Sequence, residues 1–454
     1  MTSIEKQRKK ILTIIRRRVL KNHFNVSGVN YDTWLKSFDG RFDELLTADV
    51  ETFEAGVQDV LNQLGSSHTG FYHERPNRLL PQHTINATLG RVGEAQSQRW
   101  FFLDVFEGGP ADEGGIRPGH VLHQVDGAEY APPNMPPFRT GTKHVLHVSA
   151  PDGTAAREIS IDVPITKGNK NLPPILAPKS ISSSMIEPSV GYLRITWFPG
   201  SMGLGFAKLL DEAMAGLKRK GCDRLLIDLR GNIGGGLGFA RLASYLCPHK
   251  VSVGYSVTPK RQRDGYQPED LESVVYPNSR LGFATTLARF AARDKSIHLL
   301  TQGLGPQPIH GKIVILVNEW TNSAAEMVTS FAAENKLATI VGVKTAGNVL
   351  GAVSMKVGGG YWLRLPVFGW YTEHGLCIEG RGIAPNVPVE VDPNELNSGI
   401  DRQLNTALTL LNVSTVDQGS SVHWNVKGRF KLREEAVQRP DNIHGAPPRN
   451  WAAV

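Results

Sequence analysis

Apolar residues recur at helical spacing over the first 64 positions of the chain. The pattern is carried by Leu35, Phe38, Phe42, Leu45 and Leu46, and then by Phe53, Val57, Val60, Leu61 and Leu64. Gly65 is a helix-stopping residue, and Ser66-Ser67-His68-Thr69-Gly70 follows as a polar turn. The pattern therefore predicts a mostly helical N-terminal domain over residues 1–82.

Strand and turn patterns replace the helical one from about residue 83. Residues 99–106 and 157–163 are apolar or alternating runs, and glycine- and proline-rich turns separate the predicted strands. We expect a small β domain over residues 83–166.

Strands and helices then alternate. The stretch 167–184 is rich in Pro, Asn and Ser and predicts a linker, after which strands at 190–198 and 223–230 alternate with helices at 206–218 and 239–246. This order predicts an α/β core with mostly parallel strands and helix layers. The core is expected to span 167–412 with a less regular insertion at 251–308, followed by a tail at 413–454, so the whole chain is expected to be a multidomain α+β protein.

One strand-to-helix junction carries candidate chemistry. The β-branched run 312–317 predicts a buried strand, residues 318–322 break it, and a helix is expected from Ser323 to about Lys336. Ser323 would lie beside the unpaired amides of the helix's first turn, which can hold an oxyanion, and Ala324 is small enough to let a carbonyl approach. A serine here can also be no more than an N-cap.

The composition of the chain argues against several classes of function. The chain has 454 residues, 40% hydrophobic and 20% charged, as in an ordinary soluble protein, and a net charge of +7. No aromatic-interleaved basic stripe is present, so no nucleic-acid partner is expected. No stretch is long enough to cross a membrane, and no metal-ligand cluster or phosphate loop is found, so neither stable membrane insertion nor any metal or cofactor is expected.

The cysteines and the N-terminus indicate location. Cys222, Cys247 and Cys377 lie far apart without metal-ligand spacing, which favours reduced thiols. The N-terminal apolar run is too short and interrupted for a signal peptide. These observations predict a cytoplasmic protein.

Residues 84–166 resemble a PDZ domain. The resemblance is carried by Pro110-Ala111, the Gly-Ile-x-Pro-Gly turn at 115–119 and the strand that ends in Asp126-Gly127. His120 stands where such domains more often have Asp. The resemblance implies a module that binds an extended peptide as an added strand.

Four motifs in order resemble the S41 family of serine peptidases, the C-terminal processing and tricorn-core group. They are Asp-Leu-Arg-Gly-Asn-x-Gly-Gly-Gly at 228–236, Asn-Ser-Ala-Ala-Glu at 322–326, Val-Gly-x-Lys-Thr-x-Gly at 341–347 and Glu-Gly-x-Gly-x-x-Pro-Asn at 379–386. The resemblance covers about residues 40–412 and implies a core similar to the ClpP/crotonase fold.

The S41 group has two catalytic arrangements, and the sequence distinguishes them. The processing-peptidase branch uses a Ser–Lys dyad, but the lysine position here holds Asn348, and Lys344 is in the wrong register. The tricorn-like branch uses Ser–His–Ser–Glu. Gly65-Ser66-Ser67-His68 and Ile378-Glu379-Gly380-x-Gly match its two outer segments.

The resemblance therefore implies Ser323 as nucleophile and His68 as general base. Ser67 and Glu379 would orient His68, and the amide of Ala324 with one from the 234–236 loop would form the oxyanion hole, with Gly235 favoured over Gly234. Non-catalytic alternatives stay open for these residues. His68 can be structural, Glu379 can pair with Arg381, and the glycines of the loop can be needed only because the sharp turn requires positive φ angles.

Two function classes follow. The favoured one is a cofactor-independent serine peptidase that hydrolyses peptides or unfolded proteins. The alternative is a catalytically silent peptide-binding scaffold in which the PDZ-like module acts. Hydrolysis of a non-peptide acyl compound is a weaker third reading, because a PDZ-like module implies peptide ligands.

Overall fold

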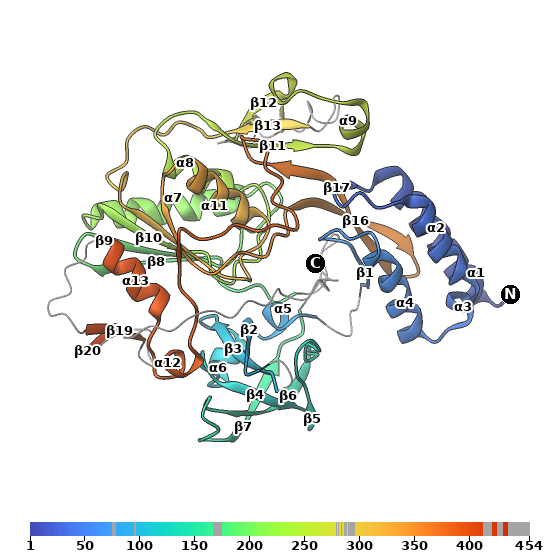
Figure 1. Ribbon diagram of the computed structural model, residues 1–454, viewed down its shortest axis with the longest axis horizontal. Helices are drawn as coiled ribbons and strands as arrows, with labels where there is room; N and C mark the ends of the chain where they lie inside the picture. Colours follow the sequence, from blue (N-terminus) through green and yellow to red (C-terminus); the bar gives the residue numbers. More distant parts are fainter. Residues whose placement is uncertain are drawn as a thin grey trace.

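The computed structural model describes residues 1–74, 79–94, 97–166, 175–277, 279, 281–282, 284–285, 288, 296–411, 420–424 and 430–434. Its helices and strands form a mixed α/β molecule with three six-stranded sheets (Figure 1). Among the described residues, no helix is both long enough and apolar enough to cross a membrane.

The central sheet positions the candidate nucleophile. Its strands are β8 Ile181–Glu187, β9 Val190–Ile195, β10 Arg224–Asp228, β14 Ile313–Val317, β15 Thr339–Gly342 and β18 Val387–Pro388, in the order β8-β9-β10-β14-β15-β18. All neighbouring pairs are parallel except β8 with β9. The predicted parallel core is confirmed. The predicted linker 167–184 is wrong at its end, because residues from Ile181 onward form β8; residues 167–174 lie outside the described part.

Helices cover both faces of this sheet. They are α7 Leu204–Arg219, α8 Phe239–Leu246 and α11 Ala324–Glu334 on one face, and α13 Arg402–Leu410 on the other. The alternation of side chains along a strand explains the two layers. Leu225 and Ile227 pack with α7, α8 and α11, whereas Leu226 between them packs with α13, and all three are fully buried.

A second sheet joins distant parts of the chain. It consists of β1 Gly70–His73, β11 Ser252–Val257, β12 Glu272–Val275, β13 Ile297–Leu300, β16 Leu350–Gly358 and β17 Tyr361–Tyr371. The order is β1-β17-β11-β13-β12, and β16 pairs with β17. The stretch 251–308, expected to be a less regular insertion, thus supplies three strands; α9 Pro259–Asp264 and the 3₁₀ helix Pro268–Asp270 lie between the first two.

The N-terminal helices pack on this second sheet. They are α1 Ser3–Asn22, α2 Tyr31–Gly40, α3 Phe42–Thr47 and α4 Val50–Asn62. These helices lie beside β16 and β17 (Figure 1), and their apolar stripes meet Leu363 and Leu365 of β17 in one cluster. The helical prediction is confirmed up to residue 62, but residues 70–73 are a strand, because β1 pairs antiparallel with β17.

The third sheet is antiparallel and has its own core. It contains β2 Ala87–Val92, β3 Arg99–Val105, β4 Val121–Val125, β5 Ala128–Glu129, β6 Thr142–Ser149 and β7 Arg157–Val163, with the short helix α6 Pro110–Glu113; α5 Pro81–Thr84 precedes it. The predicted strand at 157–163 matches β7. Two further elements follow β18: α12 Pro393–Asn397 and, within the expected tail, the hairpin of β19 Ser420–Trp424 and β20 Phe430–Glu434.

Candidate active site

Ser323 lies at the junction of β14 and α11 in a strained backbone conformation. Its φ is 54° and its ψ is −117°, a region that non-glycine residues seldom adopt, and its side chain is buried. Ser323 is the N-cap of α11, and Glu326 at the third helical position accepts its backbone N–H at 3.0 Å. Ser323 thus occupies the N-cap position of α11, and this position is compatible with a nucleophile presented on a sharp turn.

Glu326 is a structural centre that the sequence reasoning did not single out. Besides the amide of Ser323, its carboxylate accepts the hydroxyl of Thr345 at 2.6 Å and the amides of Gly347 and Asn348 at 2.7 and 3.0 Å. Burial raises its pKa to about 7, and these hydrogen bonds oppose the shift. The signal was available: a glutamate three residues after a serine is a capping-box pattern.

The predicted glycine loop lies against Ser323. A Cβ on Gly234 would come within 2.6 Å of the Ser323 Cβ, and one on Gly235 would come within 2.2 Å of the Phe198 carbonyl oxygen. Their φ angles are 85° and 131°. Only glycine permits this approach at both positions.

The amides of this loop differ in what they bind. Gly234 donates its N–H to the Asn232 side chain at 2.8 Å, and Gly236 donates to the Phe198 carbonyl at 2.8 Å. Within the described residues, the amides of Gly235 and Ala324 have no hydrogen-bond acceptor. These two amides are therefore the donors left over beside Ser323.

Three further predicted residues form a hydrogen-bond chain. Ser67 donates its hydroxyl to Glu379 Oε2 at 2.8 Å and its backbone N–H to Glu379 Oε1 at 2.7 Å. Its Oγ lies 2.7 Å from Nδ1 of His68. Val349 also donates its amide to Glu379 at 2.7 Å. Segments more than 300 residues apart in sequence thus meet at this point.

The direction of these hydrogen bonds fixes the protonation of His68. Because the Ser67 hydroxyl donates to the carboxylate, its oxygen accepts from Nδ1–H of His68, which leaves the Nε2 lone pair free to take a proton. Burial lowers the pKa of His68 to about 3, with a smaller contribution from the positive charge of Arg364. Burial raises the pKa of Glu379, and its hydrogen bonds from Ser67 and Val349 oppose the rise.

Not every predicted contact is present. Among the described residues, no hydrogen bond joins the side chains of Ser323 and His68. Such catalytic contacts often form only with substrate bound. No ion pair joins Glu379 to the exposed Arg381 in the described part, so the alternative pairing of Glu379 is absent there.

The position expected for a catalytic lysine holds the neutral side chain of Asn348. Asn348 donates its side-chain amide to Asn322 at 2.9 Å, immediately before Ser323, while Lys344 is exposed. Asn348 therefore lies close to Ser323 but carries no group that can accept a proton from it.

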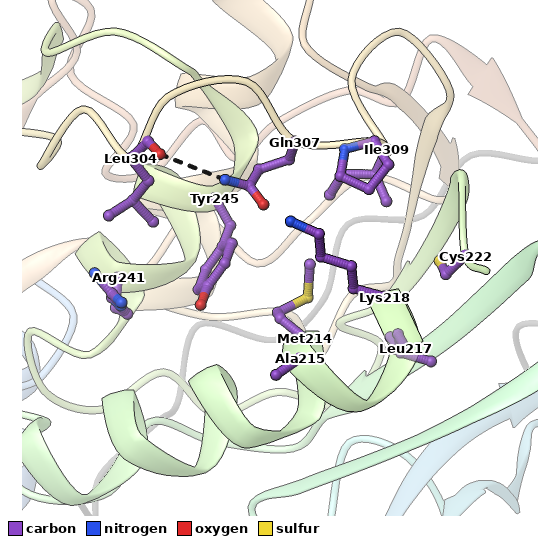
Figure 2. Close-up of a pocket in the computed structure, with 11 residues that line it drawn as sticks. Met214, Ala215, Leu217, Lys218, Cys222, Arg241, Tyr245, Leu304, Gln307 and Ile309 are labelled. Carbon is purple, nitrogen blue, oxygen red and sulfur yellow. Dashed lines mark hydrogen bonds between the residues drawn. The ribbon is translucent and has the colours of Figure 1, made fainter. Parts of the chain in front are cut away.

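The cavity drawn in Figure 2 lies away from these residues. It has a volume of about 300 Å³ and is lined by α7, α8 and the 304–309 loop, with Lys218, Tyr245 and Gln307 around its polar part. None of its lining residues belongs to the predicted site. Within the described residues, no cluster of His, Cys, Asp or Glu is suited to a metal ion.

Known proteins share this fold. The photosystem II D1 C-terminal processing protease has a structure that superposes with a TM-score of 0.53 at 17% identity, covering 91% of this chain and 98% of that one. The likeness extends over the N-terminal helices and the third sheet as well as the central one.

Sequence relatives point to the same group. A carboxyl-terminal-processing protease of Synechocystis sp. is 27% identical over 327 residues, which cover 69% of this chain and 66% of the relative. A putative tricorn protease homolog of Streptomyces coelicolor is 23% identical over 424 residues, which cover 87% of this chain but only 32% of that protein. This chain thus spans just under two thirds of the first relative and about a third of the second. The sequence pattern of peptidase family S41 matches residues 189–389, a stretch that holds Ser323, the glycine loop and Glu379, so the chain is similar to that family over this stretch.

Proposed function

We propose that this chain is a serine peptidase that hydrolyses peptide bonds in peptides or unfolded proteins, with Ser323 as nucleophile and His68 as general base. The observation that carries the proposal is the chain of hydrogen bonds from Glu379 through Ser67 to Nδ1 of His68. It leaves Nε2 unprotonated and holds the ring by two anchored residues. A structural histidine has no need of such a relay.

In the first step the Ser323 oxygen attacks the peptide carbonyl carbon while its proton passes to Nε2 of His68. Positive charge on the imidazole is stabilised through Nδ1–H and the Ser67 hydroxyl by the Glu379 carboxylate. Negative charge on the carbonyl oxygen is received by the free amides of Ala324 and Gly235.

In the second step the carbon–nitrogen bond breaks, and His68 returns the proton to the leaving amine. Water then attacks the acyl-enzyme in the same way, with His68 again accepting a proton, and releases the new carboxyl end. Apart from the attacking water, every group that these proposed steps use belongs to this chain.

The remaining finer assignments belong to this proposal. The central sheet with its two helix layers has the arrangement expected for a ClpP/crotonase-like core, and the third sheet with its separate apolar core has that expected for a PDZ-like module. We also propose that the chain has three domains, with limits at 1–82, 83–166 and 167–412. The N-terminal part is included in the catalytic unit, because it supplies Ser67 and His68.

The test is cleavage of casein, with EDTA present, by the wild type and by the variants Ser323→Ala and His68→Ala. We expect each variant to lose at least about a thousandfold in rate. A fluorophosphonate should label the wild type and not Ser323→Ala, while Ser160→Ala, at an exposed serine of β7, serves as the matched control and should label normally. A wild type that neither cuts nor takes the label would leave the peptide-binding scaffold as the better reading, and an unaffected His68→Ala would exclude His68 as the base.

A further inference from the structure

Arg364 lies on the strand that pairs with the segment carrying His68. It is in the middle of β17, opposite Gly70 of β1 on one side and opposite Ser354 of β16 on the other. Gly70 follows His68 by two residues. Arg364 is therefore held beside the candidate active site by two rows of backbone hydrogen bonds.

The side chain of Arg364 points away from the N-terminal helices. Its neighbours Leu363 and Leu365 are fully buried in the cluster with those helices, and alternation along the strand directs Arg364 to the opposite face. Tyr72 and Ser354 lie on the same face, and the Tyr72 hydroxyl donates to Ser354 at 3.0 Å. The same face also carries Trp362 and Lys356, whose Nζ lies 5.2 Å from the centre of the Trp362 ring.

Arg364 has no anionic partner in the part of the chain that the structure describes. No ion pair or hydrogen bond to its guanidinium is present there, and its Nε is shielded from solvent and unpaired. The contrast with other buried arginines is sharp: Arg194 and Arg230 bind Asp228 at 2.6 and 2.8 Å. Burial lowers the pKa of Arg364 to about 10, so the group is still charged at neutral pH.

A buried charge without a partner is costly, and a cation with only a structural role is normally paired. Arg364 is thus placed to bind an anion that the described residues do not supply.

A second, independent donor lies in α5. His83 and Gln82 are 2% and 5% exposed, and Nδ1 of His83 and Oε1 of Gln82 have no partner among the described residues. Nε2 of Gln82 lies 3.3 Å from Nε2 of His83, and donation from this amide group would place the ring proton on Nδ1. The Arg364 charge acts on both His83 and His68, and together with burial it lowers the pKa of each to about 3.

We propose that Arg364 is a specificity residue that binds a carboxylate of the peptide substrate close to the scissile bond, with Nδ1–H of His83 as a second donor. The inference rests on the proposed peptidase function and deepens it. A guanidinium N–H and a neutral imidazole N–H are both donors, and a carboxylate offers two acceptor oxygens. The carboxylate belongs either to the free C-terminus of the peptide or to an acidic side chain.

The experiment compares matched peptides on the full-length protein. A bond cleaved in casein is first identified by mass spectrometry, and peptides around it are made with a C-terminal acid or amide, and with Glu or Gln at each position flanking the bond. Initial rates give kcat and KM for the wild type and for Arg364→Gln and Arg364→Lys. Arg219→Gln, at an exposed position of α7, is the control for the same change of charge.

We expect the wild type to prefer one carboxylate-bearing peptide over its neutral partner by at least tenfold in kcat/KM, mainly through KM. Arg364→Gln should abolish that preference, Arg364→Lys should retain part of it, and Arg219→Gln should retain all of it. If the preferred carboxylate is the C-terminal one, the acid–amide pair reveals it; if it is a side chain, one Glu–Gln pair does.

Equal cleavage of every acid and neutral pair by the wild type would overturn the inference while leaving the peptidase function intact. So would an equal loss on all peptides in Arg364→Gln that still takes the fluorophosphonate label. If Arg364→Gln does not fold, the wild-type peptide pairs and Arg364→Lys still decide. Failure of the wild type to cleave or to label would overturn the peptidase function, and this inference with it.

Discussion

At the scale of single residues, the candidate site depends on a hydroxyl group that accepts one hydrogen bond and donates another. Ser67 both accepts from His68 and donates to Glu379, so its hydroxyl transmits the orientation of a carboxylate to the imidazole. Glu379 in turn accepts three hydrogen bonds and offers none. The direction of the whole relay is therefore set by an acceptor-only group at its end.

Replacing Glu379 with glutamine should reverse or break this relay. The amide places an N–H₂ group where donors now point, so the Ser67 hydroxyl loses its acceptor and no longer selects the Nδ1–H tautomer of His68. We expect kcat to fall by about 100-fold or more with little change in KM, because a wrong tautomer removes the base without removing the binding surface. Glu212→Gln on α7 is the matched control, at a largely exposed glutamate. An unchanged kcat in Glu379→Gln would mean that Ser67 alone positions the ring.

The low pKa of His68 has a consequence for stability and for activity. Burial and the Arg364 charge hold this pKa at about 3, whereas an unfolded histidine titrates near 6.5. Between these values the unfolded chain binds the extra proton, so the contribution of His68 to the free energy of unfolding is present above pH 6.5 and is lost as pH falls towards 3. At about 1.36 kcal/mol per pH unit, the wild type should lose at most about 2 kcal/mol more than His68→Ala between pH 7.5 and 5.

The measurement is denaturant unfolding across that pH range for the wild type and for His68→Ala, with the exposed His249→Ala as control. The value of kcat/KM for the wild type should show no inflection near pH 6.5. A histidine-like inflection there, or identical pH slopes for the wild type and His68→Ala, would show that His68 is accessible to protons in the folded protein.

At the scale of elements, the loop between β10 and α8 is shaped by close backbone approach. Gly235 forms a bridge with Phe198, in which Phe198 donates to Gly234 and accepts from Gly236, so the amide of Gly235 between them is turned away from the bridge. That geometry requires a residue without a side chain.

Gly235→Ala should therefore damage catalysis more than folding. The added methyl would meet the Phe198 carbonyl at 2.2 Å, and the bridge and the free amide would both shift. We expect kcat to fall about 100-fold to 1,000-fold, as when one oxyanion-hole donor is lost, with a reduced melting temperature. Gly216→Ala is a matched control, because a Cβ there meets only the end of Arg219 at 3.9 Å and alanine favours the helix by about 0.5–1 kcal/mol. Near-normal kcat in Gly235→Ala would move the oxyanion hole to another amide.

The elements also show what could be read from sequence. The strand 313–317, the helix after Ser323 and the helix 239–246 are local patterns, and the structure has them within a few residues of their predicted ends. The strands within 251–308 were missed because each of them is short and is completed only by pairing with β17 or with one another. The end of the predicted linker was missed because β8 pairs with β9 through a run of serines that resembles a loop.

In the candidate site too, some residues could be predicted from the sequence and others could not. Ser67, His68, Ser323 and Glu379 could be named from motifs, and hydrogen bonds join Ser67 to His68 and to Glu379. Glu326 was not assigned a role, because its four donors come from two separate segments. No sequence pattern pointed to Arg364, because what distinguishes this residue is the absence of an anionic partner among the described residues.

At the scale of the whole molecule, the candidate site draws on three regions of the chain. The N-terminal region supplies His68 through the turn that leads into β1, and the turn is tied to α1 by a hydrogen bond between His23, at the end of that helix, and Ser66 at 2.9 Å. The third sheet reaches the same segment through Asp104, which accepts the side-chain amide of Asn318 at 3.0 Å. Asn318 in turn accepts the amide of Gly231, at the start of the glycine loop, at 2.8 Å. The site is thus assembled by the whole chain.

Trp320 is the largest of these connections, and it lies three residues before Ser323. Its indole packs with Phe101, Leu103 and Val121 of the third sheet, and its Nε1–H donates to the Leu89 carbonyl at 3.0 Å. Trp320→Ala should cost about 3–5 kcal/mol of stability through the cavity it leaves. Trp320→Phe keeps most of the packing and loses one hydrogen bond, and should cost about 1 kcal/mol.

The two variants distinguish the contribution of Trp320 to stability from its contribution to the position of Ser323. If the third sheet helps to hold the 318–322 segment, kcat in Trp320→Ala should fall more than tenfold under conditions where the protein is still folded, while Trp320→Phe stays within a few fold of the wild type. Thermal unfolding followed by circular dichroism gives the folded fraction, and kcat is measured well below the transition. A folded Trp320→Ala with unchanged kcat would mean that Asn318 and Glu326, within the central layers, align Ser323 without help from the third sheet.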